Sequence, residues 1–240
     1  FSLNGKTVPK VESALEIKNR VLENIEASKA ARESSKFDNY LRQEYALQGK
    51  YFPERIIMPN GKKAYLSADY FEGKQIPVRS RSFVDAQGHI KWPPKGTDGF
   101  VVDSAGTPIT ELANLKAGQV LDRFGSNGGR FTSPVNNGEK LPFNTRGMPY
   151  PEGYQEYHQY EVVIDINKAN YEKAYNQLND IDKFQLQMDM EEFRFSAEDI
   201  YNPQRGGISK IFGQGGGIQI QLGTSVNWYE KLGFLREVKK

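Results

Sequence analysis

The side chains that could do chemistry in this sequence are mainly arginines, glutamines and aromatic rings in glycine- and proline-rich segments. Histidine occurs only as His89 and His158, and cysteine is absent from the 240 residues. Metal centres that need two histidines, and Ser-His-Asp triads, therefore have few residues to draw on. The lack of cysteine excludes disulfides, thiolate catalysis and cysteine-ligated metals. No G-x-S-x-G turn is present, so serine hydrolysis is also disfavoured.

Two glycine runs, 125–129 and 213–217, fit neither the phosphate-binding loop nor the dinucleotide-binding fingerprint. Taken alone, such runs are more typical of tight turns. The carboxylates of Asp189, Glu191 and Glu192 could suggest a glycosidase pair, but a solvated charged face is the favoured interpretation. Asp122, at the end of an expected strand, would either pair with an arginine or cap a turn.

The strongest signal comes from six segments that occur in a fixed order. They are Trp92-Pro93-Pro94 with Asp98-Gly99-Phe100, Leu121–Gly125, Gly129–Pro134, Arg146–Pro149, Tyr157–Val163 and Ile211–Gln219. In order and spacing they resemble the tuberculosis necrotizing toxin (TNT) family, which includes C-terminal domains of exported bacterial polymorphic toxins and secreted fungal NADases. The resemblance covers about residues 83–235 and rests on the motifs jointly.

The resemblance implies hydrolysis of the nicotinamide–ribose bond of NAD+ and NADP+, without a metal or organic cofactor, NAD+ being the substrate. This reaction needs little acid–base equipment, because positively charged nicotinamide is already a good leaving group. The protein has mainly to orient the dinucleotide, favour an oxocarbenium-like ribose and admit water on one face. A site poor in histidine and cysteine is compatible with that chemistry.

By correspondence with the family motifs, Arg123 is expected to grip the pyrophosphate with paired hydrogen bonds, and Arg146 to share that anion. The alternative for either arginine is a salt bridge to Asp122 or a position over an aromatic face. Phe124 and Phe131 are interpreted as walls for the nicotinamide or adenine ring, with a core position as the alternative.

Gln219 is the principal catalytic candidate, together with Arg123. On the alternating strand 218–222, Ile218, Ile220 and Leu222 are expected to face the core, while Gln219 and Gln221 face the other way. The resemblance gives Gln219 the task of hydrogen-bonding the ribose or the attacking water. Gln214 on the glycine loop is the fallback, and Tyr160 is expected to line the pocket, although tyrosines in strands are more often core residues.

The pattern of elements predicts an α+β fold, with a compact, strongly bent, antiparallel-rich sheet, an N-terminal helix and a few flanking helices. Apolar spacing predicts an amphipathic helix at 10–34, and residues 36–66 are expected to be irregular or short-stranded. Strands are expected at 82–84, 99–102, 119–123, 129–132, 157–166, 184–190 and 218–222, with a helix at 167–178 and a helical or turn segment at 228–235.

The predicted domains are residues 1–80, an extension from an upstream toxin region, and residues 81–240, the TNT-like domain. About forty residues, 165–207, form an insert where the family usually has a short connection. This insert could act as a lid, as a docking surface for a neutralising partner or as an elaboration of the fold.

The leading hypothesis is therefore a secreted NAD+ glycohydrolase toxin that acts in the cytoplasm of a target cell and is neutralised by a cognate immunity protein. The alternatives are an ADP-ribosyltransferase or a non-enzymatic module that binds an anion or a partner. Lysine and arginine number 32 against 30 acidic residues, which gives a net charge of +2 and argues against nucleic acid. No apolar stretch of about 18 residues is present, so this sequence predicts no membrane insertion.

Overall fold

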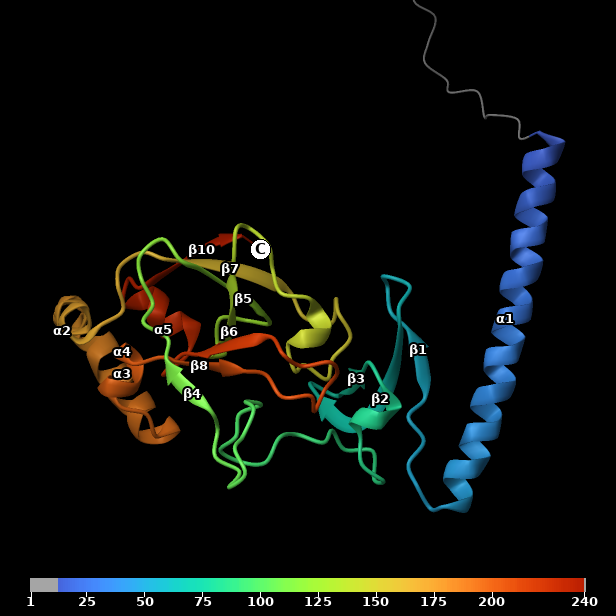
Figure 1. Ribbon diagram of the computed structural model, residues 1–240, viewed down its shortest axis with the longest axis horizontal. Coiled ribbons are helices and arrows are strands. Elements are labelled where there is room, and N and C mark those ends of the chain that lie inside the picture. Colours follow the sequence, from blue (N-terminus) through green and yellow to red (C-terminus); the bar gives the residue numbers. More distant parts are fainter. Residues whose placement is uncertain (1–12, 240) are drawn as a thin grey trace, which may run out of the picture. The chain divides into compact units, whose positions relative to one another are not determined.

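The computed structural model describes residues 13–239 and separates the chain into two units, Phe1–Phe52 and Pro53–Lys240 (Figure 1). Residues 10–12 of the expected N-terminal helix lie outside the described residues. Within 13–239, no helix combines the length and apolar character needed to span a membrane.

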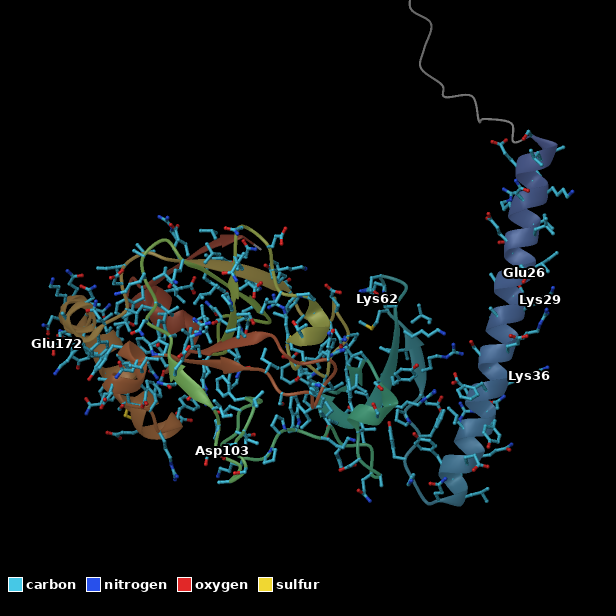
Figure 2. The ribbon with its side chains drawn as sticks, in the orientation of Figure 1. Glu26, Lys29, Lys36, Lys62, Asp103 and Glu172 are labelled. Carbon is cyan, nitrogen blue, oxygen red and sulfur yellow. The ribbon has the colours of Figure 1, made fainter. Side chains whose placement is uncertain are left out.

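The described part of the first unit, residues 13–52, contains one long helix, α1 (Ala14–Leu47). Its start is fixed by a capping box, in which Ser13 Oγ accepts from the Glu16 backbone and the Glu16 carboxylate accepts from the Ser13 backbone. None of its side chains is buried, and Figure 2 shows Glu26 and Lys29, which form a 3.1 Å ion pair, on its surface. The expected end near residue 34 was wrong. No proline or glycine interrupts the chain until Gly49, so the helix continues through residues expected to be irregular.

A small antiparallel sheet begins the second unit, with strands β1 (Arg55–Ile57), β2 (Lys63–Phe71) and β3 (Lys74–Val78) in the order β1-β2-β3. Its buried Val78 belongs to a cluster that also contains the nearby Phe83 and Phe212, which is distant in sequence. The sheet therefore packs against the segment that leads into the second glycine run.

The main sheet has seven strands, and every pairing in it is antiparallel. Its strands are β4 (Thr110–Leu112), β5 (Val120–Phe124), β6 (Phe131–Val135), β7 (Tyr157–Val162), β8 (Gln204–Gly207), β9 (Ile218–Gln221) and β10 (Leu235–Lys239), in the order β10-β7-β5-β6-β9-β8-β4. The α+β class and the antiparallel sheet are confirmed. β6 pairs with β5 through residues 133–135 and with β9 through residues 131–132, so the sheet changes partner along this one strand.

Two expected strands are not regular strands. Residues 81–83 form a short 3-10 helix, η1 (Arg81–Phe83), and Phe100 and Val102 make only isolated bridges, to Ile208 and Pro108. A second 3-10 helix, η2 (Phe143–Thr145), precedes Arg146. Around Phe100 and Val102, prolines and glycines at 93, 94, 96, 99, 106 and 108 disfavour a longer ladder.

Four helices accompany the main sheet: α2 (Lys168–Gln177), α3 (Asp180–Phe193), α4 (Ala197–Tyr201) and α5 (Val226–Lys231). The helix expected at 167–178 is confirmed, but the strand expected at 184–190 was wrong because that stretch lies within α3. Its alternation also supplies pairs four residues apart, which suit a helix equally well. Asn179 caps α3, and acidic residues follow in its first turn, as helices favour.

The main core brings the insert and the sheet together. Leu121 of β5, Tyr160 of β7, Leu186 of α3 and Ile200 of α4 are all at most 1% exposed and belong to one cluster. Residues 165–207 thus contribute side chains to the core that supports β5 and β7.

Candidate functional site

A cavity of about 460 Å³ lies where β6 changes partner. Its walls come from the loop 92–99, strands β5 and β6, the segment 146–150, and Gln219 of β9. The volume lies in the range of small-molecule sites, about 300–1,000 Å³. It brings together five of the seven residues that the sequence singled out: Arg123, Phe124, Phe131, Arg146 and Gln219. No residue of 165–207 lines it.

A buried ion pair forms part of the cavity wall. Arg146 Nη1 and Nη2 donate to the two carboxylate oxygens of Asp122 at 2.6 and 2.7 Å, and Nε donates to the Leu141 carbonyl at 3.0 Å. The two side chains are 3% and 0% exposed, and the Tyr157 hydroxyl also donates to Asp122 at 2.9 Å. All three guanidinium nitrogens of Arg146 are therefore engaged within the protein. The salt bridge to Asp122, an alternative that the sequence left open for Arg146, is the arrangement in the structure.

Arg123 is held in a different way, by backbone carbonyls. Its Nε donates to the Ser126 carbonyl at 2.6 Å and its Nη1 to the Phe131 carbonyl at 3.0 Å. No carboxylate of residues 13–239 forms an ion pair with it. Burial lowers the pKa of the guanidinium from its ordinary value, but an arginine remains charged at neutral pH. This charge is therefore not neutralised by a neighbouring acid.

Gly129 makes room for this arginine. A Cβ atom at residue 129 would overlap the Arg123 guanidinium, whereas at Gly128 the nearest atom would be Ser126 Oγ at 3.4 Å. The first glycine run thus allows close packing of a side chain against the backbone. The second glycine run allows two backbone segments to pack closely, since a Cβ at Gly217 would lie 2.6 Å from the Thr145 carbonyl oxygen.

The aromatic residues of the cavity differ in exposure. Phe124 is 8% exposed because Phe143, Tyr157 and Arg146 enclose its ring. Phe131 is 36% exposed and Trp92 is 52% exposed. The two exposed rings can offer a face to a planar ligand, whereas Phe124 is a packed wall residue.

Gln219 has one half of its amide fixed. Its Nε2 donates to the Asp98 carbonyl at 2.9 Å, and a carbonyl can only accept, so the NH2 group must face Asp98. Among the described residues, no buried side-chain nitrogen or oxygen lacks a partner. Oε1 accepts no hydrogen bond there, and we infer that it opens to the cavity as an acceptor. The expected alternation is confirmed for Ile220 and Leu222, which belong to the core.

The other two candidates lie away from the cavity. Tyr160 is 1% exposed in the main core, where burial, followed by the charges of Glu237 and Glu230, raises its pKa to about 12. The Arg123 charge acts on it in the opposite direction. Gln214 is exposed on the glycine loop and is fixed through its backbone to the Asn144 carbonyl.

Trp92, Lys95 and Asp98 are among the cavity residues to which the sequence assigned no role. Trp92 and Asp98 belong to the first motif, so the sequence already drew attention to their segment. Only the fold shows that Trp92 is exposed and that Asp98 contacts Gln219. Lys95 forms no ion pair within residues 13–239 and brings a second positive charge to the cavity. The same part of the chain holds no group of three or more potential metal ligands.

The structure is an antiparallel α+β domain with a cavity of small-molecule size that arginine, aromatic and amide side chains line. The family model described as Tuberculosis necrotizing toxin matches residues 114–179, from before β5 to the start of α3. No curated protein matches the chain. The family match covers about a quarter of the chain and supports the resemblance to the TNT family over those residues.

Replacing Arg146 should show how strongly the stability of the domain depends on the buried ion pair. Arg146→Met leaves the Asp122 carboxylate buried without its cation, and we expect the free energy of unfolding to fall by about 3–5 kcal/mol in urea titrations. The Asp122→Asn, Arg146→Met double variant should recover much of that loss. Arg205→Met is the control, because its 3.5 Å pair with Glu111 is exposed and should contribute about 0–1 kcal/mol. If both single variants lost the same free energy of unfolding, the buried pair would have no special role in stability.

Gly129→Ala should move Arg123 without unfolding the domain, because the added methyl group meets the far end of a flexible side chain. We expect the Arg123 Nε–H resonance to lose its slow exchange in NMR spectra, while the urea midpoint changes little. Gly128→Ala is the matched control and should preserve the resonance. An unchanged Arg123 signal in Gly129→Ala would show that the guanidinium does not depend on this glycine.

Proposed function

We propose that this chain hydrolyses the nicotinamide–ribose bond of NAD+, and of NADP+, to release nicotinamide and ADP-ribose. The observation that carries the proposal is the convergence of Arg123 and Gln219 on one cavity, from strands on either side of β6. The family match supports the same substrate class.

The amide of Gln219 suits the chemistry of this bond. As nicotinamide leaves, the ribose gains positive charge, and the attacking water must lie on the opposite face. An acceptor oxygen such as Oε1 can hold a ribose hydroxyl or that water, and its dipole favours the developing cation. An amide is not a strong base, so the contribution of Gln219 is orientation and electrostatic stabilisation.

The remaining cavity residues suit the rest of a dinucleotide. Trp92 and Phe131 expose ring faces on which a base can stack, and Lys95 and Arg123 supply positive charge for the pyrophosphate. In this proposal Arg146 remains with Asp122 and supports the wall, because binding phosphate would require it to leave a buried carboxylate. No cofactor takes part.

Secretion, action in the cytoplasm of a target cell and neutralisation by a cognate immunity protein are proposals that rest on the family resemblance. They concern delivery and control, whereas the cavity concerns the reaction. The activity of the purified chain can therefore be tested separately from them.

The proposed reaction predicts that the purified protein releases nicotinamide from NAD+ with no acceptor protein and with a chelator present. Gln219→Ala should lower kcat by roughly 10²–10³, as for removal of one stabilising dipole. The control is Gln177→Ala, on the exposed surface of α2, which should act like the unmodified protein. Chromatography of nicotinamide and ADP-ribose gives the rates.

Other results would favour other functions. ADP-ribose attached to protein, with little free ADP-ribose, would indicate a transferase. Intact NAD+ together with measurable binding would indicate a non-enzymatic module. Equal rates for Gln219→Ala and Gln177→Ala would remove Gln219 from the mechanism.

A further inference from the structure

Asp98 contacts Gln219 from the loop 92–99 across the cavity edge. Its backbone carbonyl accepts from Gln219 Nε2 at 2.9 Å, and Asp98 itself lines the cavity. Gln219 is only 9% exposed, so little water competes for its amide. The orientation of this amide therefore depends on where the Asp98 carbonyl lies.

The Asp98 side chain makes a second connection to the same strand. Its Oδ2 accepts from Gln221 Nε2 at 2.7 Å and lies 3.4 Å from Nη2 of Arg130. Gln219 and Gln221 share one face of β9, because side chains two residues apart in a strand point the same way. One residue thus holds both glutamines, one through its carbonyl and the other through its carboxylate.

The backbone of Asp98 is unusual in a way that fits this double contact. Its φ is 48°, in the left-handed region that non-glycine residues seldom occupy and that persists where surrounding contacts determine it. Beyond it, Gly99 and Val101 are hydrogen-bonded to Ser209 and Gly207, so the chain is fixed from residue 99 onward. The contacts of the Asp98 carboxylate with Gln221 and Arg130 fix the chain immediately before residue 99.

We propose that Asp98 is the positioning residue for Gln219: its carboxylate anchors the loop to Gln221 and Arg130, and its carbonyl thereby sets which way the Gln219 amide faces. This inference rests on the proposed function for its catalytic consequence. Without the anchor, the amide can rotate by half a turn and present NH2 to the cavity in place of Oε1. A donor there cannot accept the hydrogen bond of a ribose hydroxyl or of the attacking water.

Two substitutions separate the carboxylate from the backbone. Asp98→Gly keeps the left-handed conformation at no steric cost but removes the carboxylate, and Asp98→Asn keeps an acceptor for Gln221. Asn137→Gly is the matched control, because Asn137 is an exposed residue with a φ of 53° that does not line the cavity. All three variants replace a left-handed residue.

The first measurement is independent of catalysis. The side-chain NH2 signals of Gln219, assigned by their absence in Gln219→Ala, should show slow exchange in the unmodified protein, in Asp98→Asn and in Asn137→Gly. In Asp98→Gly they should move toward the shifts of a solvated amide and exchange faster. Unchanged signals in Asp98→Gly would overturn the proposal.

The second measurement is NAD+ cleavage. Asp98→Gly should lower kcat by about tenfold with a smaller change in KM, because misorientation affects the reacting centre more than the remaining contacts. Asp98→Asn should restore most of kcat. Equal loss in Asp98→Gly and Asp98→Asn, or a loss confined to KM, would contradict positioning.

The NMR and activity measurements distinguish failure of the proposed function from failure of the positioning role. If the unmodified protein does not release nicotinamide, the proposed function fails, while the amide signals still decide whether Asp98 orients Gln219. If Asp98→Gly does not fold, Gln221→Ala removes the 2.7 Å anchor from the strand side. It should shift the Gln219 signals in the same direction, and no shift would overturn the proposal.

Discussion

The buried pair of Asp122 and Arg146 is the constraint on which the site depends. A carboxylate with no exposure must keep its cation and its hydrogen bonds, because a buried charge without compensation costs several kcal/mol. The pair therefore fixes the segment that follows η2 against β5, and with it the cavity wall that continues through Met148 and Pro149. It also encloses Phe124, whose ring lies 5.2 Å from the guanidinium carbon of Arg146.

Because Arg146 is committed to Asp122, the two arginines of the cavity take different parts. Arg123 hydrogen-bonds only carbonyls, which orient the guanidinium without neutralising its charge. Across the cavity, Gln219 is oriented by the Asp98 carbonyl and keeps an acceptor free. Both groups are held in place before any ligand arrives, which lowers the cost of ordering them on binding.

Much of this arrangement could be predicted from the sequence, and the exceptions have physical causes. The family motifs indicated Arg123. For Gln219 strand alternation added to the motif, because a strand period of two places side chains without knowledge of the partner strands. The pairing of Arg146 with Asp122 remained one alternative among several, since the two residues meet only through the path of the chain between β6 and β7. The helix α3 was missed because four alternating apolar residues fit both periods, and the core contact of Leu186 decides between them only in three dimensions. Trp92 is likewise placed by edge contacts with Tyr150 and Phe212, which leave about half of it exposed. No local sequence pattern encodes these contacts.

The most direct test of the account is a crystal structure of the Gln219→Ala protein with NAD+. We predict the nicotinamide ribose beside residue 219, the pyrophosphate near Arg123 and Lys95, and the pair of Asp122 and Arg146 still intact. A dinucleotide bound elsewhere on the domain, or a pyrophosphate held by an Arg146 that has left Asp122, would contradict it.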